Sequence, residues 1–138
     1  MDKNKIDIVQ RIKEELEKDG LIKQVSDCSV KVVLLGVIFQ KLAYDIARKR
    51  EYDDWRNTFF VKKYLPRYKV DVKKIAGTIG KYITQYGSSY TQFLYSKFHE
   101  LPCDRKLTFD ETDYLFYKGV YMSYKLTTSP EENNNNNG

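Results

Sequence analysis

The sequence predicts an all-α protein, in which residues 1–126 form one compact bundle of five to six helices and residues 127–138 form a disordered, asparagine-rich tail. Apolar residues recur at spacings of three and four along most of the chain, which is the periodicity of a helix with one buried face. The two-residue alternation typical of strands is almost absent. With 138 residues, of which 41% are hydrophobic, the chain is long enough for one core and short for two.

The first two predicted helices have the strongest apolar patterns. Apolar residues recur at helical spacing over residues 4–19, and Gly20 is suited to end that helix in a left-handed conformation. A second helix is expected from a cap at Ser29 to about residue 50. Because the apolar residues of Val32–Phe39 cover most of the helix circumference, we expect this helix to be buried on nearly all sides.

A third helix is expected from Asp53-Asp54 to the residue before Pro66, since proline disfavours helix at the preceding position. Residues 58–64 are also rich in residue types that favour strands. This leaves open an α+β alternative, in which residues 58–98 contain strands.

Two further helices are expected between residues 71 and 102. Asp71 is a good cap for the first, and Gly87 is suited to close it. Ser88 or Ser89 is expected to begin the next, which ends before Pro102.

The last helix is expected to begin at Thr108 and to extend to about Leu126. Thr108 and Glu111 have the spacing of a capping box. From Thr127 the sequence is polar and ends in five asparagines and a glycine, a composition that cannot bury apolar surface.

Positive charge is concentrated in the middle of the chain. Residues 48–81 contain eleven basic and four acidic residues, whereas the whole chain has a net charge of +5. A local excess of this kind suits a polyanion or an acidic partner. Lysines that hold phosphates and tyrosines that stack on unpaired bases would together bind single-stranded nucleic acid, RNA in particular. The phosphate-binding candidates are Lys62, Lys63, Arg67, Lys69, Lys73, Lys74 and Lys81, and the stacking candidates are Tyr68, Tyr82 and Tyr86. The alternative is a solvated, lysine-rich surface with tyrosines at the rim of the core.

Gly77 and Gly80 form a Gly-x-x-Gly motif within the basic segment. The motif resembles the phosphate-contacting loop of K-homology RNA-binding domains. The alternative is a pair of small residues where two helices cross.

Tyrosines recur at spacings of three and four along the last predicted helix. The members of this stripe are Tyr114, Tyr117, Tyr121 and Tyr124. An apolar ring with a polar tip suits either the rim of a core or a surface that binds a partner protein.

The stretch Ile79–Phe98 combines an apolar helix, a break at Gly87 and an aromatic-rich helix with Gln92, and a tyrosine-rich helix follows at Tyr114–Tyr124. This pattern resembles the small helical subunits of type III CRISPR effector complexes. The resemblance implies a basic, non-catalytic accessory subunit that lies along a nucleic-acid channel and acts in antiviral defence.

No catalytic residue, metal site or cofactor is expected. His99 is the single histidine, and the sequence contains no P-loop, dinucleotide fingerprint or Gly-x-Ser-x-Gly motif. The N-terminus does not have the pattern of a signal peptide. We therefore expect a cytoplasmic protein in which Cys28 and Cys103 are free thiols.

Two main functional hypotheses follow from the sequence, beside a weaker third one of an enzyme that uses His99. The first is a non-enzymatic nucleic-acid-binding protein, an accessory subunit of a ribonucleoprotein. The second is a protein-interaction module, an inhibitor or adaptor of the phage or plasmid type, which binds an acidic partner through the tyrosine stripe and the basic segment.

Overall fold

The computed structural model describes residues 7–22, 24–67, 69–103 and 105–128. In these residues the chain forms seven α-helices, one 3-10 helix and no strand, so the predicted all-α class is confirmed. They are α1 (Ile8–Asp19), α2 (Asp27–Lys49), the 3-10 helix η2 (Trp55–Asn57), α3 (Phe59–Tyr64), α4 (Val72–Tyr86), α5 (Ser89–Glu100), α6 (Phe109–Tyr121) and α7 (Ser123–Thr127).

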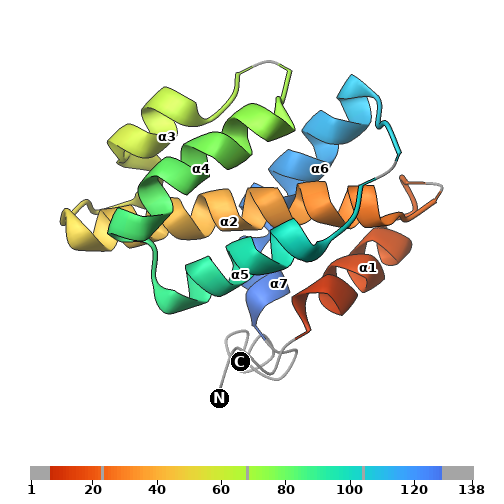
Figure 1. Ribbon diagram of the computed structural model, residues 1–138, viewed down its shortest axis with the longest axis horizontal. Helices are drawn as coiled ribbons and strands as arrows, with labels where there is room; N and C mark the ends of the chain where they lie inside the picture. The colour runs from red at the N-terminus through yellow and green to blue at the C-terminus, as the bar shows by residue number, and fades with distance from the viewer. Residues whose placement is uncertain (1–6, 23, 68, 104, 129–138) are drawn as a thin grey trace.

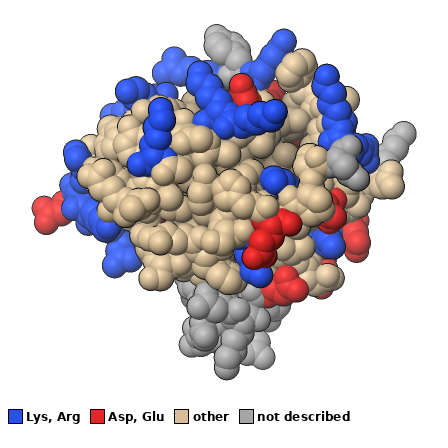
Figure 2. Space-filling view, viewed as in Figure 1, with Lys and Arg blue, Asp and Glu red and all other residues tan. Residues whose placement is uncertain are grey.

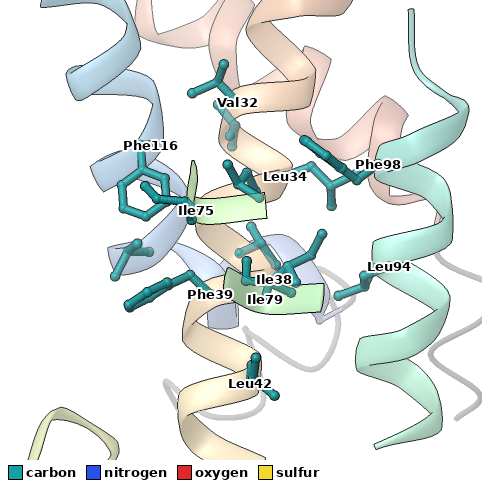
Figure 3. Packing of buried hydrophobic residues seen from close by; sticks show 14 of the residues in the cluster. Val32, Leu34, Ile38, Phe39, Leu42, Ile75, Ile79, Leu94, Phe98 and Phe116 are labelled. Carbon is teal, nitrogen blue, oxygen red and sulfur yellow. The ribbon is translucent and has the colours of Figure 1, made fainter. Parts of the chain in front are cut away.

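Helix α2 is the centre of the bundle and contacts every other helix of the described chain (Figure 1). Every residue of the run Val32–Phe39 is buried, as its sequence predicts. Phe116 of α6 lies on one side of α2, and Leu94 and Phe98 of α5 lie on the other (Figure 3). An amphipathic helix could not be covered on both sides in this way, so the apolar circumference of α2 determines the arrangement.

The closest approach between helices is that of α2 and α6, and it depends on two glycines. A Cβ added at Gly36 would lie 2.1 Å from the carbonyl oxygen of Phe116. A Cβ added at Gly119 would lie 2.0 Å from the carbonyl oxygen of Val33. Both distances are far below van der Waals contact, so only glycine permits the two backbones to pack this closely.

The helix ends follow the predicted signals with small shifts. Gly20 ends α1 with φ +73°, Asp71 caps α4, and Ser88 caps α5. Both hydrogen bonds of the Thr108–Glu111 capping box are present. The cap of α2 is Ser26 and not the predicted Ser29, because the Ser26 hydroxyl accepts the Ser29 backbone N–H.

Two predicted helices are each divided in two. The segment after Asp54 forms η2 and then α3, because the Thr58 side chain caps a new helix by accepting the Val61 N–H. The last predicted helix breaks at Met122, where α6 ends and α7 begins. Thr127 and Thr128 are buried, so the bundle extends two residues past the predicted boundary at 126, and the rest of the predicted tail lies outside the described residues.

The α+β alternative is wrong for the described residues of 58–98, which form helices and no strand. Gly77 and Gly80 both lie inside α4, so the Gly-x-x-Gly motif is not a loop. Gly80 makes room for a neighbour, since a Cβ there would lie 3.0 Å from the Tyr95 hydroxyl oxygen. This agrees with the alternative of small residues at a helix crossing.

The expectation of free thiols is wrong, because Cys28 and Cys103 form a disulfide. The disulfide joins the start of α2 to the segment after α5. Free thiols were expected as a consequence of the predicted cytoplasmic location, a compartment in which structural disulfides are rare. No helix in the described part of the chain has the length and apolar character needed to cross a membrane.

We expect Gly36→Ala to lower the free energy of unfolding by about 3 kcal/mol, because the added methyl group overpacks the α2–α6 contact. Gly77→Ala is the matched control. A Cβ at Gly77 meets nothing within 4 Å, so this change should raise the free energy of unfolding by up to about 1 kcal/mol through helix propensity. Urea unfolding followed by circular dichroism measures both, and equal stability of the two variants would contradict the close contact.

Candidate functional site

A groove of about 720 Å³ lies between α3, the α3–α4 loop and the first turns of α4. Five of the predicted phosphate-binding residues line it, and these are Lys62, Lys63, Arg67, Lys69 and Lys74. Lys and Arg side chains gather over this part of the molecule, along the upper edge of the view in Figure 2. Residues from a helix, a loop and a second helix thus converge on one feature, which we call the basic groove.

The cations of the basic groove are not neutralised by neighbouring carboxylates. In the described part of the chain, none of the five forms an ion pair. Asp71 is the acidic residue that lines the groove, and its carboxylate accepts the backbone N–H of Lys74 at 3.1 Å as the cap of α4. The groove therefore presents a net positive charge to solvent, which favours an anionic ligand.

Two hydrogen bonds hold the α3–α4 loop against α6. The backbone N–H of Val70 donates to the Asp113 carboxylate at 2.7 Å, and the Tyr117 hydroxyl donates to the carbonyl oxygen of Pro66. These bonds fix both ends of the segment that contains Arg67 and Lys69. The sequence does not indicate that Asp113 has a partner across the fold.

The structure does not bring all the predicted phosphate-binding residues together. Lys73 lines a different cavity, between α4 and α5. Lys81 lies outside the basic groove but near Tyr64, whose pKa it helps to lower. Tyr68 lies outside the described residues.

Stacking by Tyr82 and Tyr86 is not supported by their surroundings. Tyr86 is 6% exposed and packs against the core, so its ring has no free face, and its predicted role is wrong. Tyr82 is half-buried and its hydroxyl shares a 2.9 Å hydrogen bond with that of Tyr64. This bond, with the nearby charges of Lys63 and Lys81, lowers the pKa of Tyr64 from its ordinary value. Tyr64 thus lines the basic groove, with Tyr82 bonded to it at the rim of the core, as the rim alternative predicts.

Phe109 is an aromatic residue of the site that the sequence analysis did not identify. Its side chain is 62% exposed, and the Lys69 ammonium lies 4.6 Å from the centre of its ring. Phe109 lies seven residues before the buried Phe116, so helical periodicity assigns it to the core. It is exposed because the first turn of α6 extends beyond α2 (Figure 1).

The tyrosine stripe is divided between core rim and surface. The Tyr114 hydroxyl donates to the Asp19 carboxylate and the Tyr117 hydroxyl to Pro66, so both rings serve tertiary structure. Tyr121 and Tyr124 are 64% and 56% exposed. A partner-binding role is therefore open to the second pair and not to the first.

Asp19 joins α1 to α6 through a largely buried ion pair. The Lys118 ammonium lies 2.6 Å from the Asp19 carboxylate, and the two side chains are 11% and 8% exposed. Hydrogen bonds from Lys118 and Tyr114 lower the pKa of Asp19 against the opposing effect of burial. Burial by itself would lower the pKa of Lys118. The hydrogen bond to Asp19 and the charges nearby have the larger combined effect, so the pKa of Lys118 is raised.

No arrangement for catalysis is found around His99. The residue lies exposed in the last turn of α5, and the nearby Cys103 is bonded to Cys28 and so is not a nucleophile. Within the described residues, no group of three or more His, Cys, Asp or Glu side chains could hold a metal ion.

We expect Asp19→Asn to lower the free energy of unfolding at pH 7 by about 1–3 kcal/mol, because it removes the acceptor charge from Lys118 and Tyr114. The folded pKa of Asp19 is lowered, so its stabilisation is complete above the unfolded value of about 4 and is lost as the pH falls through the folded value. Urea unfolding from pH 7 to pH 2 should therefore show a shallower acid dependence in Asp19→Asn than in the wild type. Asp53→Asn, at an exposed position, is the control, and equal acid dependence in all three proteins would contradict this role.

Comparison of the chain with protein-family models, with curated proteins and with solved structures finds no match. The resemblance to CRISPR effector subunits therefore stays a prediction. The geometry of the basic groove is the starting point for a functional proposal.

Proposed function

We propose that the protein binds single-stranded nucleic acid, RNA in the first instance, with the phosphates in the basic groove. The observation that supports this most directly is the convergence on one groove of five cations that form no ion pair with any described residue. Cations in such an arrangement release counterions from a phosphate backbone, which gives affinity that depends steeply on salt.

The exposed ring of Phe109 favours binding of a single strand rather than a duplex. Phe109 lies beside Lys69, which itself lines the basic groove. A strand whose phosphates follow the groove could place one base on this ring, and base stacking contributes about 1–3 kcal/mol. Bases stacked within a duplex are not available for this contact.

An accessory role in a ribonucleoprotein is the wider form of the proposal. Its support is the sequence resemblance to helical CRISPR subunits, together with the all-α bundle. RNA is preferred over DNA on the same ground, so the binding experiment compares both.

A protein-binding module is the second candidate, and the exposed aromatic residues favour it. Tyr121 is exposed on α6, and Tyr44 and Tyr52 are exposed at the end of α2 and in the following turn. Arg48 and Arg56 line a shallow hollow together with Tyr44 and Tyr52. Tyrosine and arginine are the residue types enriched at the energetic centres of protein interfaces.

We expect Lys62→Glu combined with Lys74→Glu to weaken binding of labelled single-stranded RNA by about tenfold or more and to reduce the slope of log K against log salt by about 1 or more. Lys73→Glu has the same charge change one residue away from Lys74 but lies outside the basic groove. It should have a much smaller effect. Fluorescence anisotropy with RNA and DNA of equal sequence, between about 50 and 200 mM salt, measures all three proteins.

Phe109→Ala tests stacking separately from charge. It should weaken binding about fivefold or more while leaving the salt slope unchanged, since stacking releases no counterions. The proposal is wrong if the wild-type protein binds neither nucleic acid at the lowest salt, or if Lys73→Glu and Lys74→Glu, each measured as a single variant, weaken binding equally.

The second candidate predicts a different pattern. Tyr121→Ala combined with Tyr44→Ala should abolish co-purification of a protein partner while leaving RNA binding and the unfolding midpoint unchanged, because both side chains are exposed. Affinity capture followed by mass spectrometry measures the loss of the co-purifying partner. Tyr114→Phe is the control at a position tied to Asp19 inside the bundle, and equal loss of the partner in this variant would point to a change in fold.

A further inference from the structure

A second cavity, of about 650 Å³, lies between the start of α4 and the end of α5. These are the ends of the two helices that are distant from their connection at Gly87. Both helices pack against α2, and the distance between them increases toward the start of α4 (Figure 1). Cys28 and Val32 of α2 and Phe98 of α5, all buried, form part of the lining. We call this space the α4–α5 cavity. Its volume is within the range of sites for small organic ligands.

The interior of the α4–α5 cavity is mainly apolar. Val72, Ala76 and Leu107 contribute further apolar side chains, and Thr112 contributes a hydroxyl group. Gly77 adds open space, because a Cβ at this position would meet nothing within 4 Å. The buried residues of the lining are apolar, whereas Lys73, His99 and Arg105 are exposed, so the buried part of the cavity favours a hydrocarbon body.

The polar residues of the lining have one sign of charge. Lys31, Lys73 and Arg105 line the cavity, together with His99, and among the described residues no carboxylate does. The Lys31 ammonium donates to the carbonyl oxygen of Leu101 at 2.8 Å and lies 4.7 Å from the centre of the Phe98 ring. Lys73 and Arg105 are exposed and form no ion pair among the described residues, so their charges are available to an anion.

We propose that the α4–α5 cavity binds a fatty acid, with its hydrocarbon chain against Val32, Ala76 and Phe98 and its carboxylate at Lys73 and Arg105. The apolar lining matches the chain, and the basic residues match the carboxylate. Neither feature alone specifies this ligand, since an alcohol would leave the charges unused and a small anion would leave the apolar lining exposed to water.

The Cys28–Cys103 disulfide is part of the wall of the α4–α5 cavity. It fixes the segment after α5, which contains Arg105 and Leu107, to the start of α2. The hydrogen bond from Lys31 to Leu101 is a second attachment of the same segment. Because a fixed wall lowers the entropy lost on binding, ligand affinity should depend on the intact disulfide.

Isothermal titration calorimetry of the full chain tests the proposal, with dodecanoate and dodecyltrimethylammonium below their critical micelle concentrations and dodecanol below its solubility limit. The three probes share one chain and differ in head-group charge. Dodecanoate should bind about tenfold or more tighter than either of the others, because only its carboxylate pairs with the basic residues. Reduction with dithiothreitol should weaken dodecanoate binding about tenfold or more.

Lys73→Ala and Lys74→Ala form a matched pair for this experiment. Lys73→Ala should weaken dodecanoate binding about fivefold or more. Lys74 lines the basic groove, so Lys74→Ala should leave dodecanoate binding unchanged. Gly77→Leu should abolish binding by filling the open space, and as an exposed helix position it should not unfold the protein, which circular dichroism checks.

Three results would overturn the proposal. The first is no binding of dodecanoate to the oxidised wild-type protein. The second is equal affinity for dodecanoate and dodecanol, which would indicate nonspecific adsorption to apolar surface. The third is an equal effect of Lys73→Ala and Lys74→Ala. RNA binding is measured on the same variants, so failure here is distinguishable from failure of the basic groove.

Discussion

The contact between Gly36 and Gly119 is the constraint on which the rest of the structure depends. It permits the backbones of α2 and α6 to touch, and α2 in turn contacts every other described helix. With α6 fixed at this distance, Asp113 and Tyr117 reach the α3–α4 loop, and Tyr114 reaches Asp19. If the two helices were farther apart, Asp113 and Tyr117 would lose their hydrogen bonds to the α3–α4 loop, and Tyr114 would lose its hydrogen bond to α1. The basic groove is therefore formed by a loop whose position is determined at a helix crossing in the core.

Helix α4 separates the two candidate sites. Successive residues of a helix point about 100° apart, so Lys73 and Lys74 face different neighbours although they are adjacent in the chain. Lys74 lines the basic groove beside α3, and Lys73 lines the cavity beside α5. Two proposed anion sites of different chemistry are thus lined by adjacent lysines of one short basic run. One is polar and open to the chain of a polyanion, and the other is apolar with charge among its lining residues.

The sequence predicts the helices of this fold well and the sites less well, and the reason is physical. Helix ends depend on local hydrogen bonds, so caps such as Asp71 and Thr108 could be identified from neighbouring residues alone. Which residues share a surface depends on packing between distant segments. The exposure of Phe109 results from where α6 begins relative to the core, which no local pattern records. The burial of Tyr86, by contrast, continues the helical spacing of Ile75, Ile79 and Ile83. The disulfide is of the same kind as the exposure of Phe109, since it joins residues separated by 75 positions.

The glycines of α4 and of the α2–α6 crossing differ in a way that bears on the α4–α5 cavity. Gly36, Gly80 and Gly119 each lie against a neighbour that a methyl group would contact at 3.0 Å or less, so packing explains them. Gly77 has no such neighbour, and glycine within a helix lowers stability by about 0.5–1 kcal/mol relative to alanine. Packing in the described structure does not offset this cost. A ligand seated against the α4 backbone would offset it, because the missing side chain is what brings the hydrocarbon chain close to the helix.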